Sequence, residues 1–101
     1  MNKLTLEQYS NKIAIPVCEL KGVSRVPEIA LARQVYWFYL YSKGIILKDI
    51  ASQFNRNAHS TIISGISTIK NMIDTKNNSI DLYMNAIGYP FDSFSHQDPT
   101  N

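Results

Sequence analysis

The sequence predicts an all-α fold, a compact bundle of about five to six helices that contains a helix-turn-helix. Two observations carry this prediction. Apolar residues recur at helical spacing on both sides of a short polar break, in segments 46–54 and 58–74. A third segment, residues 26–42, has apolar or aromatic side chains on nearly every face, as expected for a helix that other helices surround.

The segments 46–54 and 58–74 are predicted to be the two helices of the helix-turn-helix. The break Asn55-Arg56-Asn57 tolerates turn geometry, and the Asn57 side chain can cap the first amides of the second helix. The apolar stripe of that second helix leaves a mainly polar flank, which carries His59, Ser60, Ile63, Ser64 and Ser67. Small hydrogen-bonding residues in the first turn of a second helix are typical of a helix that enters the DNA major groove.

The remaining segments predict shorter helices. Thr5 can cap a helix that ends near residue 13, and Pro16 fits the first turn of a short helix through residue 20. We expect Gly22 to end this short helix with the backbone freedom of a C-terminal cap, and Gly44 to end the long helix 26–42. A last short helix is expected at residues 80–87. The chain is therefore predicted to form one domain over residues 1–90, followed by a mobile tail, 91–101.

Positive charge concentrates on the predicted helix-turn-helix. The whole chain has a net charge of only +2, but residues 25–73 contain six basic residues against two acidic ones. Such a distribution suits phosphate binding of moderate, salt-sensitive affinity. The phosphate candidates in this region are Lys48, Arg56 and Arg33; for Lys48 and Arg33 a solvated surface charge is the alternative.

Several classes of protein are disfavoured by what the sequence lacks. The single cysteine, Cys18, has no partner for an internal disulfide, and no long apolar run or signal-peptide pattern occurs, so we expect a cytoplasmic protein without a membrane segment. No phosphate-binding G-x-x-x-x-G-K-[ST] loop, metal-spaced Cys/His cluster or catalytic constellation is found. We expect neither an enzyme nor a nucleotide, metal or other cofactor.

The helix-turn-helix segment resembles the C-terminal DNA-binding domain of the bacterial replication initiator DnaA, a Trp-repressor-like fold. The family has an Ile, a Phe and then Arg-Asp-His-Thr-Thr-Val, and the matching residues here are Ile50, Phe54 and the run 57–62, Asn-Ala-His-Ser-Thr-Ile. Residues 15–25 also align without a gap on the family's Ile-x-Val-x-x-Leu and a loop ending in Ser-Arg. The resemblance covers about residues 15–73, over half of the chain.

This resemblance implies roles for individual residues. Arg25 matches the basic-loop arginine that enters the minor groove, where arginine reads groove width and A·T content. His59 and Ser60 would meet base edges or a thymine methyl in the major groove, with Ser64 on the same helix, whereas Thr61 could bind a phosphate. For His59, capping or packing is the alternative role.

The chain departs from the family at Asn57 and Ala58, which replace Arg-Asp. Loss of the Asp removes an acceptor suited to a cytosine amino group, whereas Asn57 could pair with adenine. Each altered contact is worth about 1–3 kcal/mol of base discrimination. We therefore expect a target other than the initiator's own box.

The sequence thus predicts a stand-alone double-stranded DNA-binding protein, sequence-selective through a helix that starts near Ala58, in replication or mobile-element regulation. The alternative is a protein-interaction module that kept the fold, lost DNA binding and docks on a replication or mobile-element protein through exposed tyrosines. A homodimer is a third expectation, because paired half-sites commonly enlarge the interface of a lone recognition helix.

Overall fold

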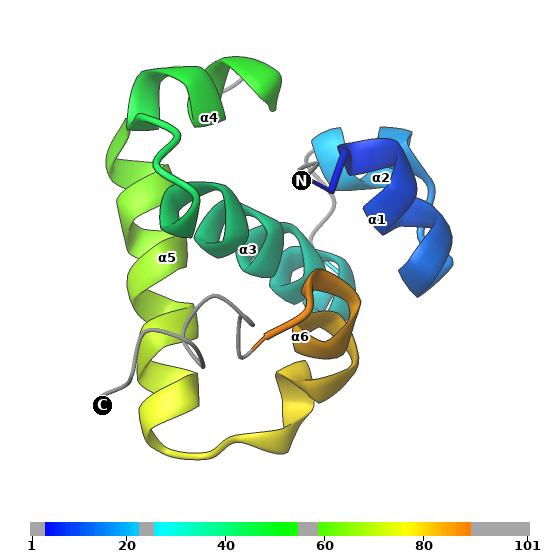
Figure 1. Ribbon diagram of the computed structural model, residues 1–101, viewed down its shortest axis with the longest axis vertical. Coiled ribbons are helices and arrows are strands. Elements are labelled where there is room, and N and C mark those ends of the chain that lie inside the picture. The colour runs from blue at the N-terminus through cyan, green and yellow to red at the C-terminus, as the bar shows by residue number, and fades with distance from the viewer. Residues whose placement is uncertain (1–3, 23–25, 55–58, 90–101) are drawn as a thin grey trace, which may run out of the picture.

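The computed structural model describes residues 4–22, 26–54 and 59–89 of the chain. In these residues six α-helices and one 3-10 turn form a compact all-α bundle, as predicted (Figure 1). The elements are α1 (Leu6–Ile13), α2 (Val17–Lys21), α3 (Pro27–Ser42), α4 (Leu47–Gln53), α5 (His59–Asp74), the turn η1 (Asn78–Ile80) and α6 (Asp81–Ile87). The predictions for Arg25, Arg56, Asn57, Ala58 and the tail 91–101 lie outside the described residues.

Helix α3 is the centre of the bundle, as its apolar pattern predicted. Pro27 occupies its first turn, and half of its residues are buried. The other helices surround it: α4 and α5 pack toward its C-terminal end, and α1, α2 and α6 pack toward its beginning (Figure 1).

The link between α3 and α4 is a tight turn at Gly44. Gly44 has a φ of 89°, in the left-handed region that favours glycine. The Gly44 N–H donates to the Tyr41 carbonyl and the Ile45 N–H donates to the Leu40 carbonyl, both at 3.1 Å, which is the Schellman pattern. The turn therefore fixes where α4 begins relative to the core helix.

Gly22 ends α2, but not in the way that the sequence suggested. Its φ of −77° lies in a region open to any residue. A side chain at position 22 is disfavoured by steric crowding and not by the backbone conformation, because a Cβ would lie 3.0 Å from the Cys18 carbonyl oxygen.

Of the two roles expected for Arg33, a phosphate contact and a solvated surface charge, the second is wrong. Its side chain is only 7% exposed, and its Nε donates to the Leu20 carbonyl oxygen at 2.7 Å. A terminal nitrogen lies 3.4 Å from the Glu19 carbonyl oxygen. Because these carbonyls belong to the last turn of α2, the guanidinium caps α2 and ties it to α3.

Tyrosine hydroxyls tie the N-terminal segment to α3. The Tyr36 hydroxyl donates to the Leu4 carbonyl at 2.8 Å, and the Leu4 N–H donates to the Tyr39 hydroxyl at 2.6 Å. The Tyr9 hydroxyl donates to the Ala32 carbonyl at 2.7 Å. Thr5 caps α1 in a reciprocal capping box with Gln8, so the predicted helix start is confirmed.

Helix α5 lies unusually close to α3 at one point. A Cβ placed on Gly65 would lie 2.6 Å from Cε3 and 2.7 Å from Cζ3 of Trp37, whose ring is 2% exposed. Ile62, Ile66 and Ile69 pack on either side of this contact, with exposures of 0–5%. Only glycine fits at position 65 without moving the indole.

We predict that Gly65→Ala destabilises the domain by about 1–2 kcal/mol. Because a Cβ would lie 2.6 Å from the indole, overpacking should cost about 2–3 kcal/mol, the upper part of its usual range, whereas alanine's higher helix propensity returns about 1 kcal/mol. Urea unfolding followed by circular dichroism measures the difference. Ser64→Ala, one residue away on the exposed side of α5, is the control and should be neutral or slightly stabilising. A Gly65→Ala variant as stable as that control would contradict the close approach.

We predict that Arg33→Met lowers the free energy of unfolding by about 2 kcal/mol, because hydrogen bonds from charged donors are worth about 1.5–3 kcal/mol. Lys48→Met makes the same change at an exposed position of α4 and should stay within about 0.5 kcal/mol of the wild type. Equal urea midpoints for the two variants would show that Arg33 does not act as a buried tie.

Alkaline pH should unfold the domain through its tyrosines. Burial, with Tyr39 nearby, raises the pKa of Tyr36 from 10.0 to about 12, and burial also raises the pKa values of Tyr9 and Tyr83. The folded state thus holds protons that the unfolded chain has lost, so stability is complete below pH 10 and falls as pH rises toward 12. The tyrosinate absorbance of Tyr9, Tyr36 and Tyr83, which rises last, should change together with helical circular dichroism. Ionisation of all six tyrosines near pH 10 with intact helices would refute this.

Candidate nucleic-acid interface

The exposed face of α5 brings together four of the residues predicted for the site. The buried stripe of this helix contains Ile62, Gly65, Ile66 and Ile69, as the periodicity indicated. The remaining positions of its first three turns are exposed, and they are His59, Ser60, Thr61, Ile63, Ser64, Ser67 and Thr68. His59, Ser60, Thr61 and Ser64 therefore share one solvent-facing surface, free of competing packing.

Helix α4 is held against the core by aromatic packing at its end. Phe54, the C-cap of α4, is fully buried and meets Trp37 edge to face, with ring centroids 5.7 Å apart and planes at 90°. Its ring also lies 6.0 Å from that of Tyr36. Since Trp37 also contacts Gly65 of α5, one indole ring positions both helices of the helix-turn-helix.

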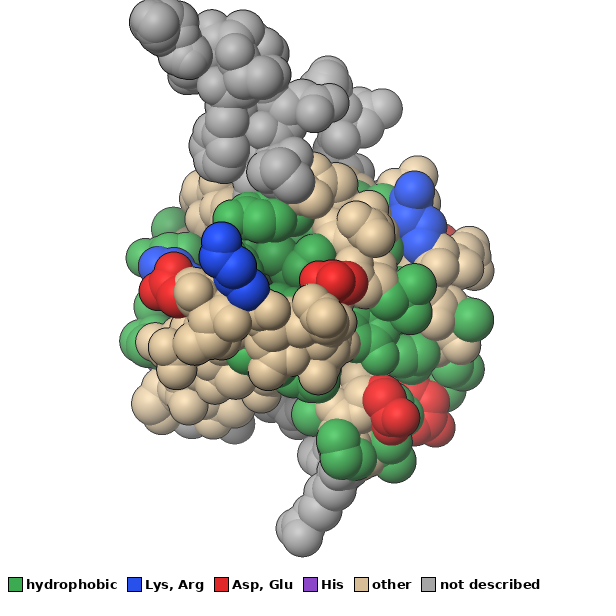
Figure 2. Space-filling model, turned by 90° about the horizontal axis from the view of Figure 1, so that it is seen from below, with side chains coloured by type: hydrophobic (Ala, Val, Ile, Leu, Met, Phe, Trp, Pro, Cys, Tyr) green, Lys and Arg blue, Asp and Glu red, His purple; other side chains and the backbone are tan. Residues whose placement is uncertain are grey.

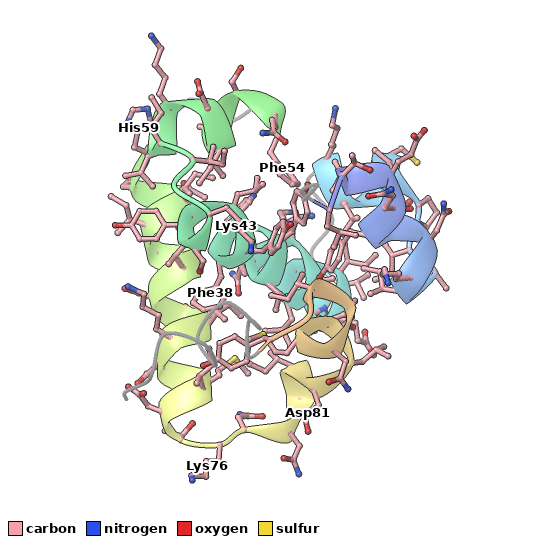
Figure 3. All side chains as sticks on the ribbon, viewed as in Figure 1. Phe38, Lys43, Phe54, His59, Lys76 and Asp81 are labelled. Atoms are coloured by element: carbon pink, nitrogen blue, oxygen red, sulfur yellow. The ribbon has the colours of Figure 1, made fainter. Side chains whose placement is uncertain are left out.

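Helix α5 carries no negative side chain near its start. From His59 to Ile73 this helix contains no carboxylate, and on α4 the exposed Lys48 is followed by the exposed Asp49. Lys76 and Asp81 lie at the opposite end of the molecule from His59 (Figure 3). Seen from that opposite end, acidic side chains are interspersed with lysines and exposed apolar groups (Figure 2).

Two grooves follow opposite flanks of α5. The first, called the Arg33 groove, is an open groove of about 530 Å³ lined by Arg33, Gln34, Trp37, Ser60, Thr61, Ser64 and Gly65. The second, called the Tyr41 groove, is about 190 Å³ and is lined by Tyr41, Leu47, Ile63, Ile66, Ser67 and Lys70. The helical repeat of 3.6 residues places the α5 residues of the two sets on opposite sides of the exposed face.

Sequence reasoning did not single out Gln34, Tyr41 and Lys70 as site residues. Gln34 borders the Arg33 groove, although it precedes the α5 residues there by more than twenty positions. No sequence pattern connects those segments. Lys70 could have been found by spacing alone, because it follows His59 by three helical turns and so shares its flank.

Other kinds of site find no support in the part of the chain that the structure describes. No group of three or more His, Cys, Asp or Glu side chains there could hold a metal ion. No described helix is long and apolar enough to cross a membrane.

Comparison with known proteins agrees with this geometry. A family model described as the bacterial DnaA protein helix-turn-helix matches residues 6–69, well over half of the chain. The match includes α4, the exposed first turns of α5 and all the elements before them. No curated protein and no solved structure matches the chain. Membership of this family implies binding of double-stranded DNA in general. The chain belongs to the bacterial DnaA helix-turn-helix family.

Proposed function

We propose that this domain binds double-stranded DNA with α5 as the recognition helix in the major groove. The observation that carries the proposal is the exposure of His59, Ser60 and Ser64 on one face of a helix whose opposite face is buried. The position of that face is set by the buried residues of α5, which pack into the core. An α-helix is also the element that fits the major groove.

The chemistry of the exposed face suits sequence-selective contacts. The imidazole of His59 and the hydroxyl of Ser60 can bond base edges, and Ser64 lies one turn beyond Ser60 on the same line. Thr61 borders the Arg33 groove, where its hydroxyl and the first-turn amides of α5 could bind a phosphate. We propose Lys48 as a further phosphate contact.

Three proposed contacts rest on the sequence alone, and only that of Arg25 comes from the family resemblance. Arg25 would enter the minor groove, Arg56 would meet a phosphate, and Asn57 would pair with adenine. Because Asn57-Ala58 replaces the family's Arg-Asp, the preferred site should differ from the initiator's box. A regulator of replication or of a mobile element, binding as a monomer or a homodimer, is the proposed context.

The alternative, a protein-interaction module docking through exposed tyrosines, gains little support. All six tyrosines lie in the described residues, and only Tyr41 is exposed. Tyr9, Tyr36 and Tyr39 use their hydroxyls to hold the N-terminal segment and α1 against α3.

We predict that affinity for a duplex selected from a random-sequence library falls steeply between about 50 and 200 mM salt, because phosphate contacts release counterions. His59→Ala should weaken binding by about 1–3 kcal/mol and relax the base preference at one position. Lys48→Ala should weaken binding to all duplexes alike and lower the salt slope by about one unit. Fluorescence anisotropy of a labelled duplex measures each quantity.

Lys76→Ala is the matched control, because it removes the same charge at the end of the molecule opposite His59 (Figure 3). It should leave affinity nearly unchanged. Salt-insensitive binding, or equal losses for Lys48→Ala and Lys76→Ala, would overturn the proposed DNA-binding face. A protein partner captured by the wild type and by His59→Ala alike would then favour the interaction module.

A further inference from the structure

The Tyr41 groove leaves two large apolar side chains about half exposed to solvent. Tyr41 is 46% exposed and Ile63 is 49% exposed, and these two side chains line the groove with Leu47, Ile66, Ser67 and Lys70. Tyr41 comes from the last turn of α3 yet lies beside the proposed recognition helix. The groove is therefore continuous with the exposed face of α5.

Lys70 is the cation of this groove. Its Nζ lies 5.5 Å from the centroid of the Tyr41 ring, within the range of a cation–π contact. It follows His59 by eleven residues, a rise of about 16 Å along the helix at about 1.5 Å per residue. Lys70 also lies one residue beyond the segment that the family model matches, so the family match says nothing about it.

The flank position of Lys70 determines what it can reach on DNA. A helix with its side chains is about 10–12 Å across, and the major groove is about 12 Å wide. A recognition helix therefore fills the groove and presents its N-terminal residues to base edges, so flank residues of its later turns approach the sugar-phosphate walls. The carboxylate that follows Lys70 on α5, Asp74, lies one turn further from His59.

We propose that Lys70 binds a backbone phosphate beside the far turns of α5 and that Tyr41 is the residue that positions its ammonium group. This inference rests on the proposed function, because it requires α5 to lie in the major groove. The aromatic ring restricts a flexible lysine before binding, so less side-chain entropy is lost when the phosphate contact forms. Tyr41 thus acts through Lys70.

The salt dependence of binding tests the role of Lys70. With a fluorescein-labelled duplex selected by the wild-type protein, Lys70→Ala should lower the slope of log affinity against log salt by about 0.9. Its affinity should fall about three- to tenfold, without a change in base preference. Lys76→Ala should change neither quantity.

A double-mutant cycle tests the positioning role of Tyr41. Tyr41→Phe keeps an aromatic ring and should bind like the wild type, whereas Tyr41→Leu keeps apolar bulk without the ring and should lose about two- to fivefold in affinity. In the Lys70→Ala background, Tyr41→Leu should have no further effect. Thermal unfolding of each variant confirms that the exposed substitutions leave the fold intact.

The outcomes separate this inference from the proposed function. If the wild type shows steep salt dependence and His59→Ala weakens binding, but Lys70→Ala leaves the salt slope unchanged, the phosphate contact is refuted and the proposed function stands. Additive losses for Tyr41→Leu and Lys70→Ala would refute the positioning role. Wild-type binding without salt dependence would overturn both proposals together.

Discussion

The close contact between Gly65 and Trp37 is the constraint on which the rest of the structure depends. It sets the distance between α3 and α5, and the same indole holds Phe54 at the end of α4. The buried Trp37 Nε1 has no hydrogen-bond partner among the described residues, which costs about 1–3 kcal/mol. Through these two contacts Trp37 holds both helices of the helix-turn-helix against α3.

Polar ties attach the N-terminal helices to this core. Arg33 holds the end of α2, and the hydroxyls of Tyr36 and Tyr39 hold the backbone of Leu4. In each tie a side chain from α3 binds a backbone group of the N-terminal segment or of α2. Helix α3 therefore positions these elements as well as α4 and α5. A buried arginine in this role explains why a cation on α3 does not contribute to the surface charge.

The sequence predicted most of the fold because its signals were local. The cap at Thr5, the turn at Gly44 and the apolar stripe of α5 each follow from neighbouring residues, and all three are confirmed. Arg33 was misjudged because its burial depends on carbonyls that lie thirteen and fourteen residues earlier in the chain. The groove that Tyr41 shares with Lys70 was missed for the same reason, since only the crossing of α3 and α5 brings them together.

Ser60, Ser64 and Ser67 along the middle of the exposed face of α5 carry one further consequence. A hydroxyl can donate or accept, and its proton rotates to suit the group opposite. A row of such groups penalises a changed base pair less than a rigid, bidentate side chain does. On DNA, this face would tolerate changed base pairs in the target site. Related sites would then differ only modestly in affinity, and the protein would occupy them one after another as its concentration rises.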